Sequence, residues 1–386
     1  MEKEKLSVLV VADVLGEENN GTTIAAMNLI RSLKKKGHDV KVLCCDKDRE
    51  GQEGYYVVPK KNFGIFNRYV QKNGVVIAKY NIKTAARALE GVDVVHSMLP
   101  FSLGTNIVKQ AYRKGIPVTS GFHMQAENIS AHFGVKNVKF INNFIYRYFY
   151  KRYYKHVNAI HYPTQFSREV FEEVVGETPG YVISNGVNLV FSDKPENFER
   201  NSHYEDKYVI LNTSRYSDEK CQKVLLRAAK KSKYSDDIQV VLAGSGPLEG
   251  KLRHIGRKLK HKPIMKFFTR EEMINNIYSA DLYVHPADIE IESIACLEAI
   301  AGGLVPVISN SKRSAARHFA LTEKNTFENN NVRSLVKQID YWIENQHLKE
   351  ANQKLYDGFI DQFDFNYCMD RMENMLYETI DNYPKD

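Results

Sequence analysis

The chain lacks most features of membrane-spanning, secreted and metal-binding proteins. Its longest apolar runs have only the length of a strand, too short to cross a bilayer. The charged N-terminus, Met1–Lys5, leads directly into an apolar segment, so we expect no signal peptide. The five cysteines are odd in number and lack metal-ligand spacing, which favours buried thiols in a reducing cytoplasm. Internal repeats and low-complexity tracts are absent from the sequence.

A dinucleotide fingerprint is also missing. The loop from Gly16 to Gly21 follows the first expected strand, but the G-x-G-x-x-G spacing is absent, so a nicotinamide-dependent enzyme is not expected. Such a loop can still bring a helix N-terminus close to a phosphate or a sugar, which makes Gly21 a candidate donor-binding residue. The sequence implies neither a metal nor another cofactor.

Length and charge predict two domains with different partners. A chain of 386 residues is too long for one ordinary domain. The net charge of +7 is uneven: residues 1–190 carry 26 Lys/Arg and 17 Asp/Glu (+9), whereas residues 191–386 carry 28 and 30 (−2). A partner attracted by positive charge therefore meets the first half.

Both halves alternate apolar, strand-length runs with helical patterns. In the first half the runs include Leu6–Ala12, Asp39–Cys44 and Ala159–Tyr162; in the second half they include Ile238–Ala243 and Val305–Ile308. This alternation predicts an α/β fold of two Rossmann-like domains facing a central cleft, with ligands at the carboxyl ends of parallel strands. The polar stretch 188–206 is interpreted as the linker.

Two glutamates, Glu290 and Glu298, are the most informative residues. The run from His285 to Gly303 begins at the end of an apolar strand, breaks at Pro286 and becomes a short helix near Ser293. Glu290 is expected in the loop above the strand end and Glu298 in the helix. Carboxylates so placed can accept hydrogen bonds from sugar or ribose hydroxyls, while the helix N-terminus faces a phosphate.

Two cations and one glycine turn come from neighbouring parts of the second half. Arg215 and Lys220 follow the strand that ends near Asn212, where they could neutralise a diphosphate leaving group. Taken alone, the two residues are more simply explained as solvated surface cations. Together with the glutamate pair, they are better explained as ligands of a diphosphate. Gly244 belongs to a turn that could approach a ligand or could simply be a tight turn.

His123 follows the expected strand Pro117–Gly121 and could hydrogen-bond a sugar hydroxyl, although most single histidines are structural. His96 and Glu127 have weaker claims of the same kind.

Together these motifs resemble glycosyltransferase family 4, retaining enzymes of GT-B fold. The resemblance covers nearly the whole chain. It implies that Arg215 and Lys220 hold the donor diphosphate and that Glu298 holds the ribose. It also implies that Glu290 contacts the donor sugar and that His123 lies near the reacting face. By this resemblance, residues 1–188 form an acceptor-binding domain, onto which the terminal helix 366–386 packs, and residues 189–365 bind the nucleotide sugar.

The sequence departs from the family pattern after the first glutamate. Glu292 and Ser293 stand where an aromatic residue and a glycine are usual. Ser293 is a candidate donor-binding residue. Because it replaces a glycine, the backbone beside the donor sugar is expected to differ from that of the family. Glu292 either binds the sugar or is an acid placed at a helix N-terminus by the helix dipole.

The implied reaction is hexose transfer from a nucleotide diphosphate sugar, with uridine as the expected base and glucose or galactose as the sugar. No carboxylate pair is evidently placed for double displacement. The resemblance implies front-face attack, in which the departing phosphate oxygen accepts the acceptor's proton.

Two basic, aromatic segments of the first half predict an anionic membrane surface as partner. No acidic residue occurs from Asn128 to Arg168 or from Gly54 to Ala88. Cationic helices with aromatic residues suit a membrane interface, where each basic residue contributes roughly 1 kcal/mol. The candidate membrane-binding residues are Lys60, Lys61, Phe63, Phe66, Arg68, Lys139, Phe140, Phe144, Arg147, Lys151, Arg152 and Lys155.

The alternative interpretation makes the aromatic residues ordinary core and the cations a solvated face. Nucleic acid is not expected, because no nucleic-acid module is recognisable. The preferred hypothesis is a cytoplasmic enzyme, peripheral on the inner face of the cell membrane, that glycosylates a lipid such as diacylglycerol. A soluble family 4 enzyme with a polysaccharide or small polar acceptor is the alternative, and a non-catalytic nucleotide-sugar-binding protein is a third possibility.

Overall fold

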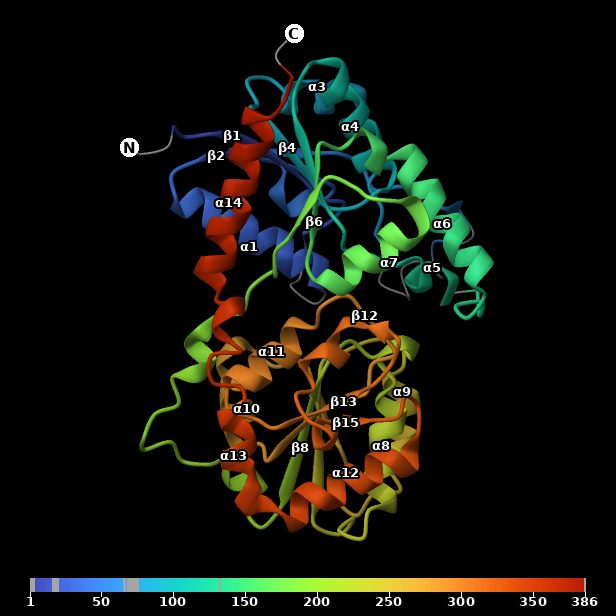
Figure 1. Cartoon of the computed structure of the whole chain (residues 1–386), viewed down its shortest axis with the longest axis vertical. Coiled ribbons are helices and arrows are strands. Elements are labelled where there is room, and N and C mark those ends of the chain that lie inside the picture. Colours follow the sequence, from blue (N-terminus) through green and yellow to red (C-terminus); the bar gives the residue numbers. More distant parts are fainter. Residues whose placement is uncertain (1–3, 16–20, 65–66, 68–75, 132, 385–386) are drawn as a thin grey trace. The chain divides into compact units, whose positions relative to one another are not determined.

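The computed structural model describes residues 4–15, 21–64, 67, 76–131 and 133–384, which fall into two compact units (Figure 1). Unit 1 comprises Met1–Asn185 and Cys368–Asp386, and unit 2 comprises Gly186–Tyr367. Each unit is built around its own parallel β-sheet, and each is described separately below.

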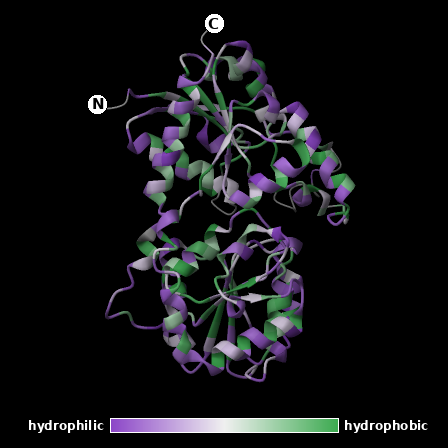
Figure 2. Cartoon of the chain, viewed as in Figure 1, coloured by the Kyte–Doolittle hydropathy of each residue, from purple (hydrophilic) through white to green (hydrophobic). Residues whose placement is uncertain are grey.

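The sheet of unit 1 has seven strands in the order β3-β2-β1-β4-β5-β6-β7, and every neighbouring pair is parallel. The strands are β1 (Ser7–Val11), β2 (Asp39–Cys44), β3 (Tyr55–Val57), β4 (Val94–Ser97), β5 (Val118–Gly121), β6 (Ala159–Tyr162) and β7 (Gly180–Val182). The central strands are buried on both faces, as expected for a sheet covered by helices on both sides, and β1 is hydrophobic over nearly all of its length (Figure 2).

Helices connect these strands as parallel crossovers require. They are α1 (Gly21–Lys35), α3 (Ile82–Ala88), α4 (Ser102–Arg113), α5 (Ala126–Ala131), α6 (Lys139–Arg152) and α7 (Gln165–Val175), with short 3₁₀ turns η1 (Lys47–Arg49) and η3 (Tyr154–His156). Thr164 begins α7 with a capping box, because its hydroxyl accepts the Ser167 amide and the Ser167 hydroxyl accepts the Thr164 amide. Asn81 caps α3 through its side-chain oxygen.

The last helix, α14 (Phe365–Asp381), belongs mainly to unit 1, where it lies beside α1 in Figure 1. Its buried face includes Met372, Met375 and Leu376. At its exposed margin Glu373 accepts hydrogen bonds from Lys36 at 2.5 Å and from His38 at 2.8 Å. These contacts attach the end of the chain to the turn between α1 and β2.

The sheet of unit 2 has six parallel strands in the order β10-β9-β8-β11-β13-β15. They are β8 (Tyr208–Thr213), β9 (Ile238–Ala243), β10 (Ile264–Lys266), β11 (Leu282–His285), β13 (Pro306–Ser309) and β15 (Thr326–Phe327). A separate ribbon pairs β12 (Ile289–Glu290) with β14 (Arg313–Ser314). Glu290 therefore lies in a short strand, whereas the sequence predicted a loop.

Helices cover both faces of this sheet. They are α8 (Gln222–Lys231), α9 (Glu249–Gly256), α10 (Arg270–Ser279), α11 (Ile294–Ala301), α12 (Val332–Glu344) and α13 (Lys349–Lys354). Short 3₁₀ turns are η4 (Leu189–Ser192), η5 (Ser202–Tyr204), η6 (Asp218–Lys220), η7 (Ala315–Phe319), η8 (Glu323–Asn325), η9 (Gln346–Leu348) and η10 (Asp361–Phe363).

Alternation along β8 divides the core of unit 2 into two clusters. Tyr208 and Ile210 face the cluster that holds α8 and α12, whereas Val209 and Leu211 face the cluster that holds α10 and α11. A parallel strand buried on both faces needs an uninterrupted apolar run, and the sequence of β8 supplies it.

The polar stretch 188–206, interpreted from the sequence as the linker, packs on unit 2. It contains η4 and η5, and Phe191 and Tyr204 are buried in the core of unit 2. The Tyr204 hydroxyl also donates to Asn276 at 2.5 Å. Two isolated aromatic residues are thus enough to attach this polar segment to the core of unit 2. Because they are isolated, they leave no periodic pattern in the sequence.

Candidate active site

Lys220 and Glu290 form an ion pair at the carboxyl edge of the unit 2 sheet. Lys220 ends η6, just after β8, and Glu290 lies in β12, just after β11. The two residues meet because β8 and β11 are neighbours. Lys220 Nζ donates to Glu290 Oε2 at 2.5 Å, and the two side chains are only 18% and 17% exposed.

Both members of the pair stay charged at neutral pH. Burial opposes the charge of Lys220, but Glu290 and Glu219 outweigh it and raise the lysine pKa. Burial likewise works against an ionised Glu290, but Lys220 and His285 lower its pKa below the usual range. The bond to Glu290 uses one of three ammonium donors, so Lys220 keeps capacity to bind phosphate oxygens.

Arg215 lies in the loop between β8 and η6, five positions before Lys220, and its side chain is half-buried. The glycine turn after β9 packs directly against this loop: a Cβ at Gly244 would stand 2.2 Å from Ser214 O, and one at Gly246 would stand 2.6 Å from Tyr216 O. Both glycines have positive φ, 152° and 157°. Gly244 therefore permits close packing of two loops that hold Arg215 at the sheet edge.

Asp288 anchors the strand that carries Glu290, and sequence reasoning missed it. Its side chain is fully buried and accepts two hydrogen bonds from the Arg313 guanidinium, at 2.7 and 2.8 Å. Asn329 and Ser311 donate to the same carboxylate at 2.7 and 2.9 Å. Because these partners lie far along the chain, the sequence gives no local signal for this positioning residue.

Ser293 has the backbone conformation that glycine favours. With φ 77° and ψ 69° it lies in the left-handed region at the start of α11. The backbone at Ser293 therefore has a conformation that the glycine usual at this position of the family would adopt more easily. The Ser293 Oγ lies 3.5 Å from His285 Nδ1. Glu292 precedes it and is only 3% exposed, so it is not a solvated surface acid.

Glu298 lies in α11 and is half-buried. Burial raises the pKa of its carboxyl to about 7, although Arg270 at the start of α10 works in the opposite direction. A carboxyl with a pKa near 7 exists in both protonation states at neutral pH, so its ability to accept hydrogen bonds depends on pH.

The candidates Gly21 and His123 belong to unit 1. Gly21 is the first residue of α1, and the preceding loop, residues 16–20, lies outside the described part of the chain. His123 follows β5, and its ring covers Gly121, where a Cβ would stand 2.2 Å from His123 Nε2. The residues that the structure brings together within one unit are therefore Lys220 and Glu290, while the assignments of Gly21 and His123 stay predictions.

The helix α6 presents aromatic residues to solvent. Phe140, Phe144 and Tyr148, spaced four residues apart, are 78%, 62% and 50% exposed. By contrast, Tyr146 and Phe149 are buried in the core of unit 1. The interpretation of the aromatic residues as ordinary core is therefore wrong for the exposed face. The cations of this segment that are predicted to bind the membrane are all exposed: Lys139, Arg147, Lys151, Arg152 and Lys155.

The second basic segment is described only in part. Lys60 and Lys61 are exposed, and the Lys61 ammonium lies 5.4 Å from the ring centroid of the half-buried Phe63. Phe66 and Arg68 lie outside the described residues. Among the helices that are described, none combines the length and the apolarity needed to cross a membrane.

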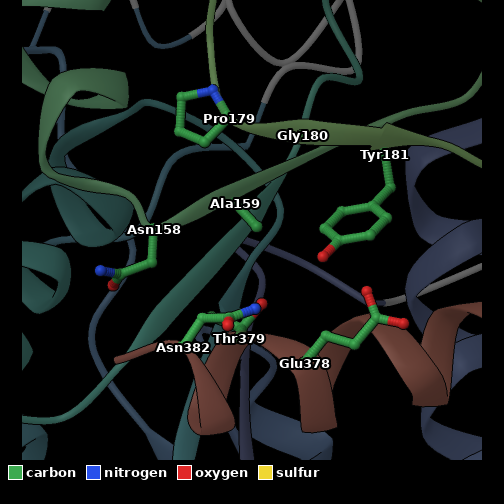
Figure 3. Close-up of a pocket in the computed structure, with 8 residues that line it drawn as sticks. All are labelled: Asn158, Ala159, Pro179, Gly180, Tyr181, Glu378, Thr379 and Asn382. Carbon is green, nitrogen blue, oxygen red and sulfur yellow. The ribbon is translucent and has the colours of Figure 1, made fainter. Parts of the chain in front are cut away.

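One hollow of unit 1 lies away from the predicted site residues. It is formed by the amino ends of β6 and β7 and by α14, and Tyr181 points toward Glu378 across it (Figure 3). A hydrogen bond to Glu378, assisted by burial, raises the pKa of Tyr181 to about 12. Because ligands of doubly wound sheets bind at the opposite, carboxyl edge, we assign this hollow no part in the reaction.

Comparison with known families decides the class of protein. The profile described as "Glycosyl transferases group 1" matches residues 193–357, and that described as "Glycosyltransferase Family 4" matches residues 19–191. The chain is a family 4 glycosyltransferase. The resemblance inferred from the motifs and the enzymatic class are thereby confirmed.

One curated relative is a glycolipid enzyme. The chain is 24% identical to α-monoglucosyldiacylglycerol synthase of Streptococcus pneumoniae over 311 residues, which are 75% of this chain and 68% of the relative. This glycosyltransferase is thus related to glycolipid glucosyltransferases.

Solved structures agree on the fold. HepE of Anabaena in complex with UDP superposes with a TM-score of 0.75 at 14% identity, covering 97% of this chain and all of that chain. WaaG, a glycosyltransferase involved in lipopolysaccharide biosynthesis, gives a TM-score of 0.71 at 14% identity over 96% of this chain and 99% of the other. These likenesses confirm the predicted GT-B fold class, with two parallel-sheet α/β domains.

Proposed function

We propose that this enzyme transfers a hexose, glucose or galactose, from a UDP-linked donor to a membrane lipid such as diacylglycerol, with retention at the anomeric carbon. The observation that carries the donor half of the proposal is the Lys220–Glu290 pair at the carboxyl edge of unit 2. Arg215 precedes Lys220 in the same loop after β8. The observation that carries the acceptor half is the exposed aromatic and basic face of α6.

In the proposed donor complex, cations of unit 2 hold the diphosphate. Lys220 and Arg215 donate to its oxygens and stabilise the negative charge that develops when it departs. Glu290 accepts hydrogen bonds from the sugar ring, and Asp288 holds Glu290 in place through the β12–β14 ribbon. Glu298 accepts hydrogen bonds from the ribose hydroxyls. UDP in the solved HepE complex supports uridine as the base.

The proposed chemistry needs no covalent enzyme intermediate. The bond from the anomeric carbon to the diphosphate oxygen breaks on the same face at which the acceptor hydroxyl attacks. The new carbon–oxygen bond forms, and the acceptor proton passes to the departing phosphate oxygen. Positioning and charge stabilisation then supply the rate enhancement. The name of the S. pneumoniae relative specifies an α-glucosyl product, which supports retention from an α-linked donor.

The acceptor assignment rests on α6. Exposed phenylalanines lose contact with water when they enter the interface of a bilayer, and flanking cations are attracted to anionic lipids. A solvated helix face has no comparable reason to expose Phe140 and Phe144. The relative's diacylglycerol product supports the same choice, and we accordingly place the enzyme on the inner face of the cell membrane.

The direct test is a product assay with UDP-glucose or UDP-galactose and vesicles of anionic phospholipid containing diacylglycerol. We expect a hexosylated lipid by mass spectrometry, an α linkage by NMR, and flotation of the enzyme with the vesicles at low salt. Transfer to polysaccharide or to a small polar acceptor, without flotation, would replace the lipid assignment by the soluble alternative. If UDP is released from neither UDP-glucose nor UDP-galactose, the proposed donor is wrong.

A further inference from the structure

We propose that unit 1 contains a site for a divalent transition metal, with Zn²⁺ as the reference ion, formed by the imidazoles of His96, His123 and His161. The three side chains come from three neighbouring strands at the carboxyl edge of the sheet: β4, the residues after β5, and β6. This proposal concerns unit 1 alone and does not depend on the acceptor.

Strand register brings the histidines to one face. His96 of β4 is paired with Thr119 of β5, and His161 of β6 is paired with Gly121 of β5. Residues 119 and 121 are two apart, so they face the same side of the pleated sheet. The two histidines therefore flank β5 on that side, with Gly121 between them.

Gly121 makes room for the third ring. It has no side chain, and the His123 ring folds back over it, since a Cβ at this position would stand 2.2 Å from His123 Nε2 and 2.3 Å from Cδ2. The His123 and His161 ring centroids are 5.5 Å apart, and those of His96 and His161 are 6.4 Å apart. A glycine in the middle strand thus allows three imidazoles to gather.

Hydrogen bonds fix the tautomers of two rings. The Thr119 hydroxyl donates to Val95 O, so its oxygen accepts from His96 Nδ1, 2.9 Å away. His161 Nε2 lies 2.7 Å from Ile183 O, which can only accept, so this nitrogen carries a proton. When these rings are neutral, the lone pairs lie on His96 Nε2 and His161 Nδ1. Such second hydrogen bonds are typical of metal-ligating histidines.

The lone-pair nitrogens point to a ligand that the protein does not supply. His96 Nε2, His123 Nε2 and His161 Nδ1 are buried and lack a hydrogen-bond partner among the described residues. His96 and His161 are 0% and 2% exposed. Buried polar atoms are nearly always paired, so three unpaired nitrogens at one place require an explanation.

Their spacing suits one metal ion. One ring nitrogen from each histidine lies within 4.8 Å of those from the other two. A tetrahedral zinc site places nitrogens about 2.1 Å from the ion and hence about 3.5 Å apart, so binding would draw each ring inward by at most about 1 Å. Three histidines leave the fourth position for water or another oxygen ligand.

Binding through His123 Nε2 would still leave Nδ1 of that ring for the sugar contact predicted from the sequence.

The experiment uses the full chain, stripped with a chelator and titrated with Zn²⁺ in competition with a chromogenic chelator. Bound metal is counted by mass spectrometry after gel filtration. We expect one Zn²⁺ per wild-type chain and an unchanged result for His254→Ala, which removes an exposed histidine of unit 2. His161→Ala should weaken binding by more than about 100-fold, because it removes a ligand.

Two further variants keep all three histidines. Gly121→Ala introduces a methyl group where the His123 ring lies and should also abolish stoichiometric binding. Thr119→Val removes the acceptor for His96 Nδ1 and should weaken binding about 10- to 100-fold. Circular dichroism tests whether each variant is folded.

Substitution of Co²⁺ for Zn²⁺ in the wild type decides the case even if the variants do not fold. Intense visible absorption, typical of four-coordinate cobalt with nitrogen ligands, is the expected result. The proposal is overturned if the wild type retains less than one metal per chain at micromolar Zn²⁺, or if folded His161→Ala binds Zn²⁺ as tightly as the wild type. Weak absorption typical of six-coordinate cobalt overturns it as well.

Discussion

The carboxyl edges of the two sheets carry opposite kinds of chemistry. In unit 2 the edge holds charged groups: Lys220 pairs with Glu290, and Asp288 pairs with Arg313. In unit 1 the corresponding edge holds neutral imidazoles, His96 and His161 among them. Two buried carboxyl groups, Asp13 and Asp46, lie at the same edge after β1 and β2, and the exposed cations of unit 1 include those of an outer helix, α6.

The two edges suit different kinds of ligand, although both sheets have the same parallel architecture. Mostly buried ions at a strand edge can hold a charged diphosphate, because a low-dielectric environment strengthens their field. Neutral nitrogen atoms suit a metal or hydroxyl groups, and exposed cations suit a membrane surface. The same strand–helix repeat therefore carries ion pairs at this edge in unit 2 and a cluster of imidazoles in unit 1.

The largest effect is expected from removing a charged side chain at the carboxyl edge of the unit 2 sheet. Lys220→Ala should reduce kcat/KM for UDP-glucose about 100- to 1000-fold, as expected when a preorganised group that stabilises a leaving group is removed. Steady-state UDP release measures this effect. Lys230→Ala, at an exposed position of α8, is the matched control and should behave as wild type. A loss below about threefold in folded Lys220→Ala would contradict the assignment of this edge to the diphosphate.

The second prediction tests the outer helix of unit 1. Phe140→Ser combined with Phe144→Ser should weaken binding to anionic vesicles about 10- to 100-fold, since each phenylalanine contributes up to about 2 kcal/mol when removed from water. Vesicle flotation measures the partition. Phe267→Ser removes a phenylalanine of unit 2 that is 54% exposed and should leave flotation unchanged. Equal loss in both variants would mean that α6 has no special role.

The third prediction uses the pKa of Glu298, which burial raises to about 7. In the proposed complex the ionised carboxylate accepts from both ribose hydroxyls, so affinity for UDP-glucose should rise up to about tenfold between pH 6 and pH 8. Because the folded-state pKa is above the unfolded one, the contribution of this group to stability decreases as pH rises from about 4.5 to 7.

Calorimetric titration at several pH values measures this dependence. Glu298→Gln keeps the size of the side chain and should bind more weakly and without the pH dependence. A wild type whose affinity for UDP-glucose is flat across this range, or falls with pH, would contradict the role of Glu298.

The smallest expected effect concerns Ser293. A non-glycine residue at φ 77° bears a steric cost, so Ser293→Gly should raise the free energy of unfolding by up to about 1 kcal/mol. Loss of the 3.5 Å contact with His285 offsets part of this gain. Chemical denaturation measures the change. Ser293→Ala, which keeps the strain and loses the hydroxyl, is the control, and a more stable alanine variant would contradict this explanation.

The fold class and the family could be predicted because their signals are local. Apolar runs mark strands directly, and β6 has the predicted bounds Ala159–Tyr162. The Glu290 and Glu298 spacing crosses only one strand end and one helix, so it is also visible in the sequence.

What escaped prediction depends on register and on long-range contacts. Asp288 is bound by Arg313 and Asn329, which belong to later elements. The gathering of His96 with His161 depends on which residue of β5 is paired with each. No spacing rule along the chain contains that information, because parallel strands are joined by crossovers of variable length.

The central claim is that the charged edge of unit 2 holds the nucleotide sugar. Hydrogen–deuterium exchange of the full chain with and without UDP-glucose tests it most directly. We predict protection in residues 214–222, 244–248 and 288–298, which contain Arg215, Lys220, Gly244, Glu290 and Glu298. Unchanged exchange in all three segments at a saturating donor concentration would contradict the account.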